Sequence, residues 1–91
     1  MRAFEVSVNG ERLCLAGIGD DGVLTTIVNW LARPGDGSLH LEVGGLISPT
    51  KEHVTWVRQK PLSVGDNVQV KIVEIEAADN PITKYRLDPT S

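Results

Sequence analysis

The sequence predicts a mainly β fold: a small antiparallel barrel or sandwich of six strands with one short inserted helix, which makes α+β the alternative class. Three observations support this. An Asn-Gly pair joins two alternating segments, further Val- and Ile-rich segments are separated by Gly- or Pro-containing turns, and one segment opens with Ser-Pro and stops at a proline. At 91 residues the chain can bury one core, so residues 1–91 are expected to form a single domain. The expected strands cover residues 3–8, 11–16, 23–33, 39–47, 67–76 and 82–88, and the expected helix covers residues 49–59.

The N-terminal hairpin has the strongest local signal. Asn9-Gly10 favours a type I′ turn, because both central residues of that turn need positive φ. A two-residue turn fixes the register, so we expect Val6 opposite Leu13. The same register places Phe4 opposite Leu15, again on the core face.

Residues 23–33 fit either a helix or a strand. Leu24, Ile27, Val28 and Leu31 have helical spacing, but the β-branched run at 25–28 favours a strand. As a strand the segment is apolar on both faces, which predicts a position in the centre of a sheet. In the strand that follows, Gly44-Gly45 predicts a bulge or a bend.

The segment 49–59 carries helix signals at both ends. Ser48 can cap the helix, Pro49 suits its first turn, and Pro61 ends it. Trp56 would lie at the flank of the buried side. There the indole would serve either as an anchor at the rim of an interface or as a lid over the core.

The apolar pattern of residues 67–76 changes face midway along the strand. Val68, Val70 and Ile72 share one face, and Val73 and Ile75 share the other. A β-bulge between Lys71 and Val73 would keep both sets inside the core.

Composition limits the compartment and the partners. Nine Lys and Arg against twelve Asp and Glu give a net charge of −3, which disfavours nucleic acid or anionic lipid as a partner held by charge. Cys14 is the single cysteine, so an internal disulfide is excluded, and no segment resembles a signal peptide or a membrane span. We expect a cytoplasmic protein that does not enter a membrane and has no cofactor or metal.

The stretch Gly17–Gly22, GIGDDG, matches the G-x-G-x-x-G fingerprint of dinucleotide-binding folds. It follows an apolar strand, and Glu42 stands where the ribose-binding acid of such folds would be. Against it, Asp20 and Asp21 would place carboxylates beside the phosphates, and the β-branched run beyond is a poor helix former. We expect a hairpin loop here and keep a nucleotide site as an alternative.

A second alternative is a barrel that binds single-stranded nucleic acid. Residues 61–76, PLSVGDNVQVKIVEIE, are similar in their turn-then-strand rhythm to pieces of many small barrels, including oligonucleotide-binding ones. Such barrels stack bases on aromatic residues within a basic groove. Only Lys84-Tyr85-Arg86 interleaves the two residue types, so nucleic acid is not the leading expectation.

No catalytic set is evident either. Cys14, His40 and His53 have the side chains of a nucleophile and bases, but their spacing does not join them, so we expect no enzyme. Cys14 should behave as a small buried hydrophobe.

The leading hypothesis is a protein-interaction module, such as an adaptor, an inhibitor or an immunity-type protein. It would dock on a protein partner, or on itself, through a sheet edge or the helix surface. The residues expected to make the contact are Trp56, Arg58, Lys60 and Tyr85.

Overall fold

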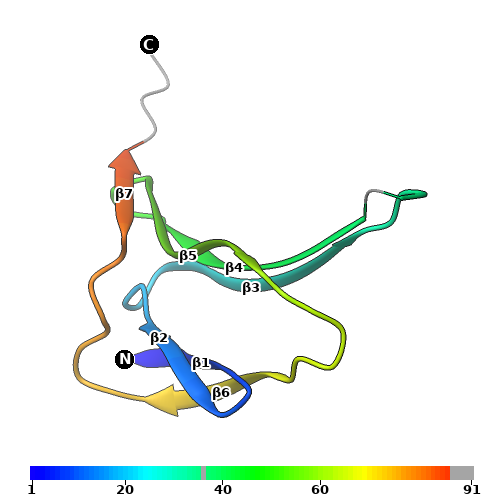
Figure 1. Cartoon of the computed structure of the whole chain (residues 1–91). Helices are drawn as coiled ribbons and strands as arrows, with labels where there is room; N and C mark the ends of the chain where they lie inside the picture. The colour runs from blue at the N-terminus through cyan, green and yellow to red at the C-terminus, as the bar shows by residue number, and fades with distance from the viewer. Residues whose placement is uncertain (36, 87–91) are drawn as a thin grey trace.

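The computed structural model describes residues 1–35 and 37–86, which form two antiparallel sheets packed against each other (Figure 1). The strands are β1 (Arg2–Val8), β2 (Glu11–Ala16), β3 (Gly22–Leu31), β4 (Ser38–Ile47), β5 (Glu52–Pro61), β6 (Val68–Glu74) and β7 (Thr83–Arg86). One sheet has the order β2-β1-β6 and the other has the order β3-β4-β5-β7. The mainly β prediction is confirmed, but the sheets do not close into a barrel. Leu87 and Asp88, the end of the last expected strand, lie outside the described residues.

The predicted helix at 49–59 is wrong, because this segment is a turn followed by β5. Lys51 N–H donates to the Ser48 carbonyl at 3.3 Å, and Lys51 has a φ of 56°. Beyond the turn, burial alternates: Val54 and Trp56 lie in the core. Pairing with β4 on one side and β7 on the other therefore overrides the local Ser-Pro signal.

The N-terminal hairpin is confirmed, but its register is right only near the turn. Asn9 and Gly10 have φ of 55° and 82°, as a type I′ turn requires. Farther along, the register shifts between Val6 and Ser7, so Val6 lies opposite Cys14 and Phe4 opposite Ala16. The shift is a β-bulge that puts small side chains on the core face, where they let the two sheets pack closely.

The core lies between the sheets, and its members are mostly small or β-branched. Its buried side chains are Val6, Val8, Cys14 and Ala16 from one sheet and Leu41, Val43, Val54 and Trp56 from the other. Phe4 is only partly buried against this cluster. The role predicted for Cys14, that of a small core hydrophobe, is confirmed.

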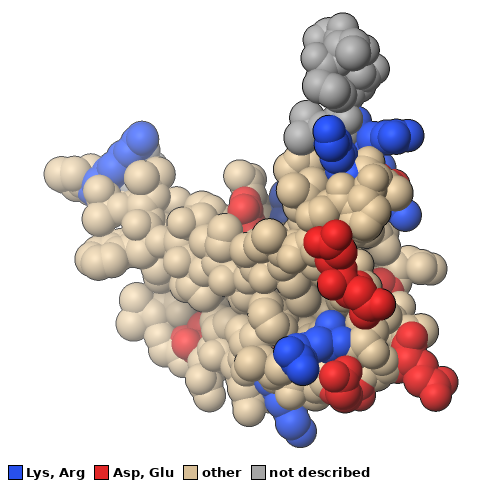
Figure 2. Space-filling model, turned by 180° about the vertical axis from the view of Figure 1, so that it is seen from behind, with Lys and Arg blue, Asp and Glu red and all other residues tan. Residues whose placement is uncertain are grey.

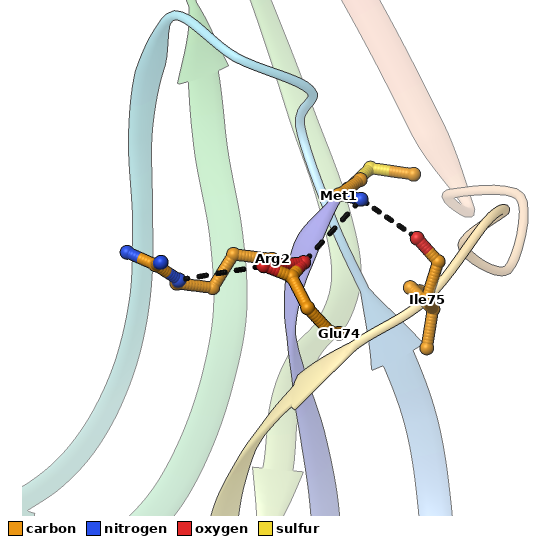
Figure 3. A network of polar contacts seen from close by, with 4 residues as sticks. All are labelled: Met1, Arg2, Glu74 and Ile75. Carbon is orange, nitrogen blue, oxygen red and sulfur yellow. Dashed lines mark hydrogen bonds and ion pairs between the residues drawn. The ribbon is translucent and has the colours of Figure 1, made fainter.

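Strand β6 pairs with β1 without interruption from Arg2↔Glu74 to Val8↔Val68, so the predicted bulge near Lys71 is wrong. Because β6 is an edge strand, it does not need to bury both of its apolar sets, and Ile72 stays 68% exposed. At the end of this pair the amino group of Met1 donates to the Ile75 carbonyl at 2.7 Å and lies 3.4 Å from Glu74 Oε2 (Figure 3).

Hydrogen bonds among asparagine and aspartate residues tie two loops together. Asn9 accepts a hydrogen bond from Asn67 N–H at 2.9 Å and donates from Nδ2 to Asp66 Oδ1 at 3.0 Å, which ties the β1–β2 turn to the β5–β6 loop. Ser63 N–H also donates to Asp66, at 2.8 Å. The Asn9 hydrogen bond, followed by that from Ser63, lowers the pKa of Asp66 below its ordinary value.

Asp79 holds the segment between β6 and β7 across both sheets. Its N–H donates to the Leu15 carbonyl at 2.8 Å, and its carboxylate accepts from Leu15 N–H at 2.9 Å. The indole N–H of Trp56 donates to the Asp79 carbonyl at 2.8 Å. Asp79 therefore links strand β2 of one sheet to β5 of the other.

Strands β3 and β4 form a long hairpin whose outer part, residues 27–35 and 37–42, we call the arm. The strands pair from Gly22↔Ile47 to Leu31↔Ser38, and Figure 1 shows the arm extending away from the three-stranded sheet. The Cα radius of gyration is 14.5 Å, whereas a compact domain of this length has about 12 Å. Strand β3 lies at the edge of its sheet, so its predicted central position is wrong.

Candidate functional site

The two sheets have four edge strands, and these differ in how their free backbone edges are protected from pairing with another strand. Proteins guard a free edge with charged residues, prolines, bulges or short strands, because its unpaired N–H and C=O groups invite another strand. Three of the edge strands carry charges: Glu11 and Arg12 in β2, Lys71 and Glu74 in β6, Lys84 and Arg86 in β7. Strand β3 has none of these protections: its ten residues carry no charge and pair with β4 without a bulge.

The side chains of β3 add apolar surface to this free edge. Those that are exposed are Val23, Ile27 and Leu31 on one face and Val28 and Trp30 on the other. Trp30 is 74% exposed, although a tryptophan has more apolar surface to bury than most residues. Figure 2 shows the arm as a projection whose visible surface is mostly neither acidic nor basic, with basic atoms near its tip. We call the backbone edge and these side chains the β3 edge.

Two features of the sequence place β3 along β4. One is a run of β-branched residues, and the other is a pair of glycines that lets the two backbones lie close together. The β-branched run 25–28 favours the extended backbone, as predicted. At the start of β3, Gly22 has a φ of 150°, and a Cβ there would clash with the Leu46 carbonyl. A Cβ on Gly45 would clash with the Val23 carbonyl, so glycine at these positions lets β3 lie against β4. The register of β4 with β5 shifts between Val43 and Gly44, where a bulge or bend was predicted.

The GIGDDG stretch leads from β2 in one sheet to β3 in the other. The two strands do not pair, so the predicted hairpin loop is wrong. Gly19 does have a positive φ, 89°. A dinucleotide fingerprint needs a helix after the glycines, with its N-terminus facing the phosphates. The element that follows Gly22 is strand β3 instead, so the backbone donors of such a helix are absent at this place.

An open hollow lies on the outer face of the four-stranded sheet, beside the β3 edge. Its volume is about 300 Å³, and its lining includes Thr25 and Ile27 from β3, Glu42 from β4, and His53 and Tyr85. Gly44 is part of the lining, and a Cβ there would lie 2.8 Å from the Val54 carbonyl oxygen, so glycine lets β4 lie close to β5 at this point. The apolar surface of the β3 edge therefore continues onto the face of the sheet.

The four residues expected to make the contact do not form one surface. Trp56 is a lid over the core rather than a rim anchor, since it is buried and its N–H is bonded to Asp79. Arg58 donates to Thr83 Oγ1 at 3.3 Å, beside Tyr85, whose ring stacks on His53 with centroids 5.1 Å apart. Lys60 is half-buried near the other end of β5.

Among the described surfaces, the region around β7 is the one most similar to a nucleic-acid-binding surface. Figure 2 shows basic atoms gathered beside β7, next to the grey residues. However, Lys84 Nζ lies 3.5 Å from a Glu52 carboxylate oxygen, which compensates its charge. The stacked pair of His53 and Tyr85 is one platform, whereas binding of a strand uses several in series.

The side chains that could act as a nucleophile or as a base do not lie together. Cys14 is in the core, His40 Nε2 lies 3.2 Å from Asn29 Nδ2 on the arm, and His53 stacks on Tyr85. Burial, followed by the carboxylate of Asp79, raises the pKa of the Cys14 thiol to about 11, which keeps it protonated. Within residues 1–35 and 37–86, no group of His, Cys, Asp and Glu side chains is arranged to hold a metal ion.

Comparisons with known proteins identify no relative of this chain. No protein-family model, no curated protein and no solved structure matches the chain. In the described part of the chain there is no helix of the length and apolar character needed to cross a membrane.

Proposed function

We propose that the protein is a non-enzymatic interaction module that binds an extended protein strand at the β3 edge. The observation that carries this proposal is the combination of a long, uncharged, unbulged edge with exposed apolar side chains on both faces. In strand addition, main-chain hydrogen bonds supply affinity and alternate side chains supply specificity. An adaptor or an inhibitor can act in this way without any catalytic group.

The exposed apolar area of the β3 edge sets an upper limit on the affinity of such binding. We take its exposed apolar side chains to offer on the order of 500 Å². At about 25 cal/mol per Å², burying that area contributes on the order of 10 kcal/mol before costs. Association costs about 4–15 kcal/mol in lost freedom, so moderate affinity, supported by main-chain hydrogen bonds, is the expected outcome.

Amide chemical-shift mapping tests the proposal. The ligands are eight-residue peptides of alternating Val and Thr with terminal lysines for solubility, and the matched controls have prolines at alternate positions, which removes main-chain donors. We expect the Val-Thr peptides to shift the amide signals of residues 22–31 and the proline peptides to leave them unchanged. Shifts confined to other strands, or equal shifts with both peptides, would disprove strand addition at β3.

The two alternatives are tested in the same way. A single-stranded oligonucleotide should leave the signals around Tyr85 unmoved, and NAD should leave those of Gly17–Gly22 unmoved. A salt-dependent shift at Tyr85 would replace the proposal with nucleic-acid binding. A shift at Gly17–Gly22 would replace it with nucleotide binding.

A further inference from the structure

We infer that the strand that occupies the β3 edge is β3 of a second copy of this chain, paired antiparallel about a two-fold axis. The two four-stranded sheets would then form one continuous eight-stranded sheet. This inference rests on the proposed function, because it names the partner that the β3 edge binds.

Charge supports a second copy. In a two-fold interface each patch meets itself, so any charge near the axis faces its own kind. The chain carries a net charge of −3, but residues 22–31 carry none, so self-pairing brings no like charges together along the strand. A partner selected by charge would find no complementary group on β3.

The order of residues along β3 favours one register of self-pairing. A two-fold axis perpendicular to the sheet must pass through a residue facing its own copy, because paired residues point to the same face. With Ile27 on the axis, Val23 faces Leu31 and Leu24 faces Trp30, in each case from the other copy. The polar residues Thr25 and Asn29 then face each other. This register matches apolar with apolar and polar with polar at every pair except Thr26 and Val28.

The neighbouring registers mix these classes at more pairs than the register centred on Ile27 does. An axis on Thr26 would place Ile27 opposite Thr25, and an axis on Val28 would place Ile27 opposite Asn29. The sequence of the strand therefore distinguishes the register centred on Ile27 from those on either side.

The area of the interface and the way in which pairing stops at two chains both support a dimer. The exposed apolar side chains of β3 offer on the order of 500 Å² on each copy, so pairing could bury at most about 1,000 Å² of them, the size at which specific complexes begin. Pairing of identical edges uses up both, so it stops at two chains. The outer strand of the joined sheet on either side would be β7, which is short and carries Lys84 and Arg86 and is thereby protected.

Light scattering coupled to gel filtration, from about 10 to 200 μM chain, is the first test. A single chain has a mass of 9.9 kDa, and we expect the measured mass to approach twice that value as concentration rises. Ile27→Lys should give the monomer mass throughout, because two ammonium groups would meet at the axis. The matched control is Ile72→Lys, the same change at an exposed isoleucine of edge strand β6, which should remain dimeric.

Charge complementation gives the sharper test. The Ile27→Lys and Ile27→Glu variants should each be monomeric, and an equal mixture should recover the dimer mass, because opposite charges then face each other at the axis. Circular dichroism should show the wild-type β signal for each variant. Failure of the mixture to associate would disprove the register centred on Ile27.

Two further outcomes separate the inference from the proposed function. A wild-type chain that stays monomeric at 200 μM overturns the second copy as partner, while the peptide titration still decides whether β3 binds strands. A dimer that survives Ile27→Lys but dissociates with Ile72→Lys places the interface on β6 and overturns the inference, while the peptide titration again decides whether β3 binds strands.

Discussion

Truncating Val43 measures how much of the stability depends on the contact between the two sheets. Val43 is fully buried in β4, and Val43→Ala removes the equivalent of two methylene groups. Transfer free energies give about 0.8 kcal/mol for each. A residual cavity of about 50 Å³ would add about 1 kcal/mol at 24 cal/mol per Å³ if the surroundings did not relax. We therefore expect a loss of about 1.5–3 kcal/mol in the free energy of unfolding.

The matched control is Val64→Ala, the same change at a side chain that is 96% exposed in the β5–β6 loop. It should cost less than about 0.5 kcal/mol, because it removes no packing contact. Urea unfolding followed by far-ultraviolet circular dichroism, at one protein concentration, gives both values. In thermal unfolding, Val43→Ala should lower Tm by about 10 °C. Equal costs for the two variants, or a cost below about 0.5 kcal/mol at Val43, would refute the assignment of the core.

Three further predictions concern single polar groups. Native Cys14 should react with iodoacetamide at pH 8 far more slowly than the urea-unfolded chain does, because its raised pKa and burial withhold the thiolate; equal rates would contradict this. Thr26→Val should raise the free energy of unfolding by about 1 kcal/mol, because the buried Thr26 hydroxyl has no hydrogen-bond partner, and a loss of stability in urea would count against it. Asp66→Asn should be less stable than the wild type at pH 6, but the difference should shrink as pH falls below 3.8, because a carboxylate with a lowered pKa stabilises the fold only while ionised. Urea titrations at pH 6 and pH 3 would show it, and an unchanged difference would exclude the role assigned to this carboxylate.

Strand β3 shows what a sequence pattern can predict and what it cannot. The β-branched run 25–28 predicted its extended backbone correctly, because that preference is local to the side chains. Its two apolar faces predicted a central strand, whereas β3 is an edge. The pattern records that both faces are apolar, but not whether the strand has a neighbour on each side. The uncharged run Gly22–Leu31 was the signal that could have identified the β3 edge.

By itself, the sequence determined the β class, the turn at Asn9-Gly10 and the small buried cysteine. These follow from φ preferences and from the alternation of side chains within a few residues. Only the tertiary structure decided that Leu13 is bulged out of the hairpin register and that 49–59 is a strand with Trp56 in the core. It also decided which strands are left at the edges. The reason is physical: strand pairing and the close approach of two sheets join residues far apart in the chain, and they outweigh local preferences of about 1 kcal/mol or less.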